Sequence, residues 1–175
     1  MNRTCLLALP VTIVVLAPAF AHAAQPTLLG TFQSWGAYAV ASSDGKVCYA
    51  LSRPTSTEPA KIKRDPAFFL VNDWPARQAH AEPEIVPGFQ YKDGSGVAAE
   101  LGGDTISFFT KNDAGGGGAW VEAQADEERL VTAMKTAPEA VVTGTSKRGT
   151  VVRDTYSLAG FADALAKAQS ACAAP

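Results

Sequence analysis

The sequence is poor in the residues that most catalytic and metal sites use. Of 175 residues only three are cysteine and two are histidine. Basic residues are not in excess, because 15 lysines and arginines are outnumbered by 17 aspartates and glutamates. This balance argues against nucleic acid or an anionic membrane surface as the main partner. The chain is 47% apolar and 18% charged, a composition that excludes disorder and supports a buried core.

Only the N-terminus has a long apolar run, and it has the pattern of a secretory signal peptide. Arg3 supplies a positive start, residues 6–16 are almost all apolar, and Ala21-His22-Ala23 matches the A-x-A cleavage motif. No later segment approaches the roughly 20 apolar residues that a membrane span needs. We therefore expect cleavage after Ala23, a single exported domain over residues 24–175, and no transmembrane segment in it.

Removing the signal peptide also removes Cys5 and His22, and leaves Cys48, Cys172 and His80. Two cysteines in an exported chain most often pair, since the periplasm and the exterior are oxidising. A bond across this sequence separation would stabilise the fold by about 4 to 5 kcal/mol in the loop-entropy model. The alternative is two separate buried thiols. A zinc site is disfavoured because the paired spacing of zinc ligands is missing.

Most of the remaining chain is predicted to form short strands. Residues 32–42 and 47–51 flank Asp44-Gly45, which predicts a hairpin. Residues 53–66, with three prolines and several basic residues, are predicted to be an exposed connection. The apolar run 67–71 favours a strand buried on both faces. Glycines 115–118 predict a flexible loop. Further strands are predicted at 82–86, 97–101, 105–110, 119–122, 141–145 and 150–158.

Two helices interrupt this series of strands. The first begins near Asp126, where three consecutive acids favour a helix N-terminus, and ends before Pro138. The second begins at about Ala159 and carries apolar residues three and four apart up to Cys172. Many short strands with two short helices predict a mainly-β fold, a sandwich or barrel with helical additions.

Few residues are candidates for catalysis. His80 lies between prolines and is expected to be a surface or loop histidine. Glu82 and Glu84 share one strand face, where two acids are commoner as a solvated edge than as a glycosidase pair.

Asp154 is more unusual, because strand alternation places it on the apolar face of the last strand. A carboxylate there must be paired or hydrogen-bonded. We expect a structural ion pair with Arg148, or with Arg64 as the alternative partner, in preference to a catalytic acid.

Basic residues gather in two predicted connections. The first holds Lys61, Lys63 and Arg64, and the second holds Lys147 and Arg148. If the fold brings the two connections together, they form a surface for an acidic partner or an anionic envelope polymer. The alternative is ordinary loop charge, which also protects sheet edges from pairing.

Several motifs, in order along nearly the whole mature chain, resemble the invasion-associated locus B family. Residues 146–150, residues 154–161 and the final Cys172 resemble the C-terminal signature of that family. The others are Phe32-x-x-Trp35, Lys46-Val47-Cys48-Tyr49-Ala50-Leu51-Ser52-x-Pro54, Lys63-Arg64-Asp65-Pro66, Ala119-Trp120-Val121 and Ala133-Met134-Lys135.

The resemblance implies an immunoglobulin-like β-sandwich in a small exported protein of Gram-negative bacteria. It would be periplasmic, associated with the outer membrane or secreted, and such proteins are named for a role in host-cell invasion. The resemblance implies no catalytic residues and no cofactor. We therefore expect a non-catalytic protein that binds an envelope or host-surface partner. Two alternatives stay open: a periplasmic hydrolase using Asp154 or Glu84, and an accessory factor for envelope stability.

Overall fold

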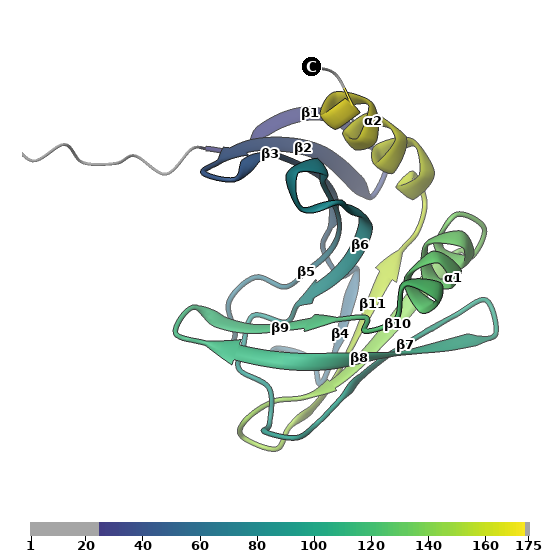
Figure 1. Ribbon diagram of the computed structural model, residues 1–175. Helices are drawn as coiled ribbons and strands as arrows, with labels where there is room; N and C mark the ends of the chain where they lie inside the picture. The colour runs from purple at the N-terminus through teal and green to yellow at the C-terminus, as the bar shows by residue number, and fades with distance from the viewer. Residues whose placement is uncertain (1–24, 174–175) are drawn as a thin grey trace, which may run out of the picture.

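Antiparallel strands dominate the computed structural model, which describes residues 25–173 (Figure 1). The predicted signal peptide therefore lies outside the described residues. The strands are β1 Thr27–Phe32, β2 Trp35–Ser42, β3 Gly45–Ser52, β4 Ser56–Glu58, β5 Phe68–Trp74, β6 Ala79–Val86, β7 Val97–Leu101, β8 Asp104–Asp113, β9 Gly116–Trp120, β10 Glu139–Thr145 and β11 Val151–Ser157. The helices are α1 Gln124–Met134, α2 Phe161–Ala173 and a single 3-10 turn, η1 Pro75–Arg77.

The strands form one sheet that folds over into two layers. Its order is β1-β2-β3-β5-β6-β9-β8-β7-β10-β11-β4. The long strand β8 joins the layers, because its first half pairs with β7 and its second half pairs with β9. The helices α1 and α2 lie beside the sheet in Figure 1. The predicted mainly-β sandwich with two short helices, the last one C-terminal, is confirmed.

An aromatic cluster fills the core between the layers and α2. Trp35 of β2 contacts Phe161 of α2, with ring centroids 4.8 Å apart. Phe69 of β5 contacts Tyr156 of β11 at 5.5 Å. All four side chains are fully buried. These contacts join residues from both layers, so the aromatic residues that alternate along separate strands meet in one core.

Strand β5 differs from the prediction of a strand buried on both faces. Phe69 and Val71 are buried, whereas Phe68, Leu70 and Asn72 between and beside them are only partly covered. The reason is that β5 lies in an outer layer, with the core on one side only. The apolar run, which lacks clear alternation, therefore predicted more burial than β5 has.

The glycine-rich segment is also more ordered than predicted. Gly116, Gly117 and Gly118 belong to strand β9 and pair with the end of β8. A Cβ atom at Gly117 would lie 2.6 Å from the carbonyl oxygen of Phe89. Glycine is required here because another backbone segment approaches the strand closely.

A covalent bond links strand β3 to the C-terminal helix α2. Cys48 of β3 and Cys172 of α2 form a disulfide bond, with their Cα atoms 5.8 Å apart. A small cluster of Ala37, Ala39 and Ala168 surrounds the buried Cys48. Small side chains let α2 lie close to the β2–β3 hairpin, and the disulfide holds the last helical turn there.

Removing the disulfide should destabilise the protein strongly. The bond closes a sequence separation of 124 residues, and we expect the Cys48→Ala/Cys172→Ala variant to lose about 4 kcal/mol of unfolding free energy. Urea unfolding of the oxidised protein, the reduced protein and the variant measures this loss. Reduced protein should match the variant. A variant within about 1 kcal/mol of the oxidised protein would contradict the prediction.

Candidate functional site

The two basic connections of the sequence meet at one groove. It has a volume of about 630 Å³ and lies between the segment that precedes β5, the segment that follows β6 and the β10–β11 turn. We call it the basic groove. Its lining residues are Ile62, Lys63, Arg64, Asp65, Gly88, Phe89, Gln90, Ser146, Lys147, Arg148 and Thr150.

Backbone hydrogen bonds hold the walls of the basic groove together. The amide of Lys147 donates to the carbonyl of Gln90 at 2.7 Å, and the amide of Asp65 donates to the carbonyl of Gly88 at 3.0 Å. Gly88 has a φ of +73°, and a Cβ atom there would overlap the carbonyl of Asp65. Glycine at this position therefore permits the close approach of two connections that are distant in sequence.

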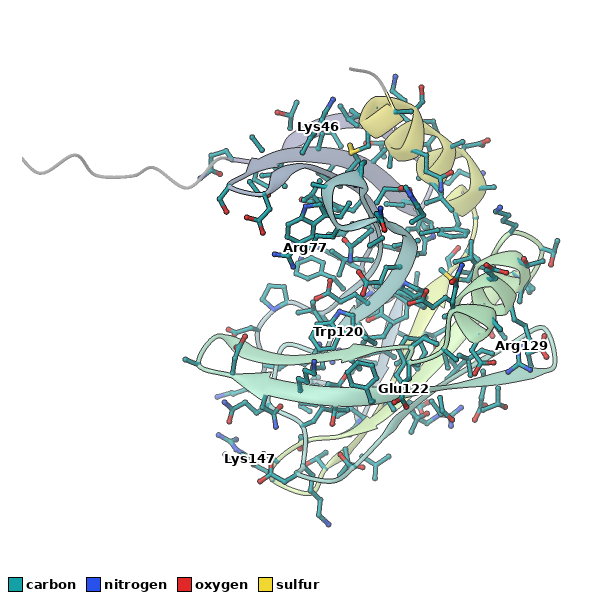
Figure 2. All side chains as sticks on the ribbon, viewed as in Figure 1. Lys46, Arg77, Trp120, Glu122, Arg129 and Lys147 are labelled. Carbon is teal, nitrogen blue, oxygen red and sulfur yellow. A yellow bond between two sulfur atoms is a disulfide. The ribbon has the colours of Figure 1, made fainter. Side chains whose placement is uncertain are left out.

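Three cations of the basic groove lack an acidic partner. Lys63, Lys147 and Arg148 are exposed, and none of them lies within 4.0 Å of a carboxylate among residues 25–173. Within residues 25–173 the Lys147 ammonium donates only to the Gln90 side chain, at 3.3 Å. Figure 2 shows Lys147 at the edge of the molecule. Asp65 is the acid in the lining. The groove therefore carries a positive excess.

Lys61 and Arg64 occupy different places from these three cations. Lys61 is exposed but is outside the lining of the groove. Arg64 lines the groove, yet only 9% of its side chain is exposed. Its guanidinium is paired with a carboxylate inside the protein, so Arg64 adds little positive charge to the predicted basic surface.

Arg64 forms the buried ion pair with Asp154. Its Nη1 donates to Asp154 Oδ2 at 2.7 Å, and its Nη2 donates to Asp154 Oδ1 at 2.5 Å. The hydroxyl of Thr57 donates to Asp154 Oδ1 at 2.7 Å. Nη1 also donates to the carbonyl of Pro87 at 2.9 Å. The paired carboxylate therefore has its oxygen atoms satisfied although only 6% of its side chain is exposed.

The expectation that Arg148 pairs with Asp154 is wrong. Arg148 lies at the exposed tip of the β10–β11 turn, beyond the paired residues of the strands. Strand β4 pairs with β11 and sets Thr57 opposite Asp154. The chain that follows β4 then brings Arg64 to the carboxylate. The cross-strand pairing of a three-residue strand decides the partner, and the sequence gives little sign of that strand.

Two tyrosines near this ion pair stay neutral. Burial raises the pKa of Tyr91 and of Tyr156 well above the usual value, and the negative charge of Asp154 raises both further. Because these phenols do not ionise near neutral pH, they add no negative charge beside Asp154, and its carboxylate remains the counter-ion of Arg64. The charge of the groove therefore comes from the exposed cations.

The predicted catalytic candidates are separated in the structure. Asp154 is held in the buried ion pair, which argues against a role as a free catalytic acid. Glu84 lies on β6 and accepts a hydrogen bond from Asn72 at 2.9 Å. Burial raises the pKa of Glu84, and the charge of Glu82 adds to this. Glu82 and Glu84 lie on the same strand, so they flank no common cleft from opposite sides.

His80 lies at the surface, and the described residues offer no metal site. The His80 side chain is 68% exposed, and its Nδ1 lies 3.1 Å from Asp73 Oδ1. Residues 25–173 contain no group of three histidine, cysteine, aspartate or glutamate side chains suited to a metal ion. Within the same residues, no helix has the length and hydrophobicity to cross a membrane.

Breaking the buried Arg64–Asp154 pair should lower the unfolding free energy far more than removing Arg148, the partner that the sequence favoured. Arg64→Met leaves the Asp154 carboxylate buried without a counter-ion, so we expect a loss of about 3 to 5 kcal/mol of unfolding free energy. Arg148→Met, a matched control at an exposed turn, should change it by less than about 0.5 kcal/mol. Urea unfolding of both variants measures the difference. Equal losses would contradict the assignment.

Comparisons with known proteins agree with the fold. The crystal structure of invasion associated protein B from Bartonella henselae matches with a TM-score of 0.58 and 13% sequence identity, over 81% of this chain and 95% of that one. At this identity the likeness concerns the fold alone. No curated protein matches the chain. The family model for the invasion associated locus B (IalB) protein matches residues 35–169. This match covers most of the chain, which therefore belongs to the invasion associated locus B family.

Proposed function

We propose that this chain is an exported, non-catalytic protein that binds an anionic group of an envelope or host-surface partner in the basic groove. One observation carries the proposal: two basic segments more than 80 residues apart in sequence line the same groove. Lys63, Lys147 and Arg148 are exposed there without a carboxylate within ion-pair distance among the described residues. Cations free of internal partners are available to an anionic ligand.

Export is supported by two independent features. The first 23 residues have the three regions of a secretory signal peptide. Cys48 and Cys172 form a disulfide bond, and such bonds persist in oxidising compartments. The similar Bartonella henselae structure bears the description invasion associated protein B. We extend that description to this chain only as a proposal, with an envelope or host-surface molecule as the partner.

The alternatives have less support. A hydrolase based on Asp154 would need a free acid, whereas the carboxylate is bound by Arg64 and Thr57. A hydrolase based on Glu84 would need a second acid across a bound substrate. An accessory role in envelope stability predicts that a deletion strain has envelope defects with normal adhesion. A binding role at the host surface predicts the reverse.

Reversing two charges should remove most of the polyanion binding. We expect the protein to bind immobilised polyphosphate at low ionic strength and to release it as salt rises. Lys147→Glu/Arg148→Glu should weaken binding by about tenfold or more, which corresponds to about 1.4 kcal/mol. The control Lys135→Glu/Lys167→Glu makes the same change in net charge at two exposed positions outside the groove, one directly after α1 and one in α2. Equal weakening by both variants would reduce the effect to net charge and contradict the proposal.

Export can be tested on the protein recovered from cells. Intact-mass measurement of the secreted or periplasmic protein should show a chain that begins at Ala24 and has lost two hydrogens to the disulfide. Ala21→Arg/Ala23→Arg blocks the small positions of the cleavage motif and should retain the full precursor mass. An untagged wild-type chain found in the cytoplasm with Met1 or Asn2 as its first residue would contradict export.

A further inference from the structure

The outer face of the first sheet layer carries flat aromatic rings around a polar centre. Strand register places two rows of side chains across this face, on the side away from the core. The first row is Tyr38, Tyr49, Asn72 and Glu82, and the second is Leu51, Leu70, Glu84, Trp120 and Phe109. We call this surface the aromatic face. In Figure 2, Trp120 lies on the concave side of the curved sheet, as does Arg77.

Two glycines allow rings to lie down on this face. A Cβ atom at Gly36 would lie 2.7 Å from the Tyr38 ring, and one at Gly118 would overlap the Trp120 ring. Both glycines precede their aromatic residue by two positions and so share its face of the strand. Each ring therefore leans along its own strand over the glycine. Tyr49 stacks on Tyr38 with centroids 5.4 Å apart and an angle of 14°.

Hydrogen-bond acceptors separate the aromatic rings. Asn72 and Glu84 lie between the tyrosine pair and Trp120, and their side chains are hydrogen-bonded at 2.9 Å. Glu82 projects from the same face of β6. Ionised carboxylates only accept hydrogen bonds, so they favour a ligand rich in hydroxyl or amide donors. They also repel anions, and they make the centre unsuitable for an apolar peptide.

Part of this face is hollowed. A groove of about 480 Å³ runs over β9 and the end of β8, and its lining includes Glu84, Gly118 and Trp120. It shares no lining residue with the basic groove. Cations lie over two further rings, with Arg77 3.7 Å from the centre of Trp74 and Lys111, which lines the groove, 5.3 Å from that of Phe109. No such cation contact is found for Tyr38, Tyr49 or Trp120 among the described residues.

We propose that the aromatic face binds an uncharged oligosaccharide, with Trp120 and the Tyr38–Tyr49 pair as stacking platforms and Asn72 and Glu84 as hydrogen-bonding groups between them. A sugar ring offers an apolar side that stacks on an aromatic ring and a rim of hydroxyl donors that bond carboxylate and amide oxygens. The platforms are three strand spacings apart from β3 to β9, about 14 Å along the sheet. That span suits a chain of several sugar units. This site is separate from the proposed anion site.

The test uses defined uncharged sugars on the full mature protein. Chitopentaose, cellopentaose and mannopentaose are titrated by isothermal calorimetry and by tryptophan fluorescence. We expect at least one of them to bind saturably. Trp120→Ala and Tyr49→Ala should each weaken that binding by about tenfold or more, whereas Trp120→Phe should retain most of it. Gly118→Ala keeps every aromatic ring but lifts Trp120 from the strand, so it should weaken binding as well.

Two controls keep the outcome decisive. Circular dichroism and the thermal midpoint identify any variant that fails to fold, and Trp120→Phe with Tyr49→Ala then carry the test. Lys147→Glu/Arg148→Glu should leave sugar binding unchanged, which separates this site from the basic groove. The proposal is overturned if none of the three sugars binds at millimolar concentration. It is also overturned if binding is insensitive to Trp120→Ala and Tyr49→Ala, or if Trp120→Ala abolishes binding of polyphosphate instead.

Discussion

The buried ion pair between Arg64 and Asp154 is the interaction on which the groove side of the molecule depends. It joins the connection before β5 to the middle of β11, and Arg64 also reaches the carbonyl of Pro87 after β6. Three segments that are far apart in sequence thus converge on one guanidinium. Two charges with under a tenth of their side chains exposed are tolerated because each is matched by the other and by hydrogen bonds. Losing either partner would leave an uncompensated charge below the groove.

The sheet works under a different constraint, because one face must pack and the other must meet solvent. Trp35 and Phe69 point into the core while Tyr38 and Leu70 on the same strands point outward. The outer side chains are still partly covered, since rings lie over glycines and stack across strands. This explains why an outer strand can read as a continuous apolar run. It also gives the aromatic face its shape, because glycine beneath a ring lets the ring lie flat.

Sequence patterns predicted what depends on local chemistry. The hairpin at Asp44-Gly45 was predictable because glycine readily adopts the positive φ that such turns need, and Gly45 has a φ of +105°. Alternation of apolar and polar residues identified most strands to within a few residues. The pattern did not identify β1, where Thr27–Phe32 lacks a clean alternation. Nor did it identify β4, since three residues give no period to read. Because the sequence did not reveal β4, it also predicted the wrong partner for Asp154. The pairing of β4 with β11 brings Arg64 close to the Asp154 carboxylate. The aromatic rows could not be predicted because they depend on the register of six strands.

The charge of the basic groove and the stability of the groove are carried by different residues. Arg64 is neutralised by Asp154 and contributes shape, whereas Lys63, Lys147 and Arg148 are exposed and contribute charge. A variant of Arg64 would change folding and binding together and would be hard to interpret. Variants at Lys147 and Arg148 act on a turn whose backbone bonds to Gln90 and Thr150 do not involve the side chains. The fold therefore allows the surface charge to be changed by substitution while the ion pair beneath it keeps the segments in place.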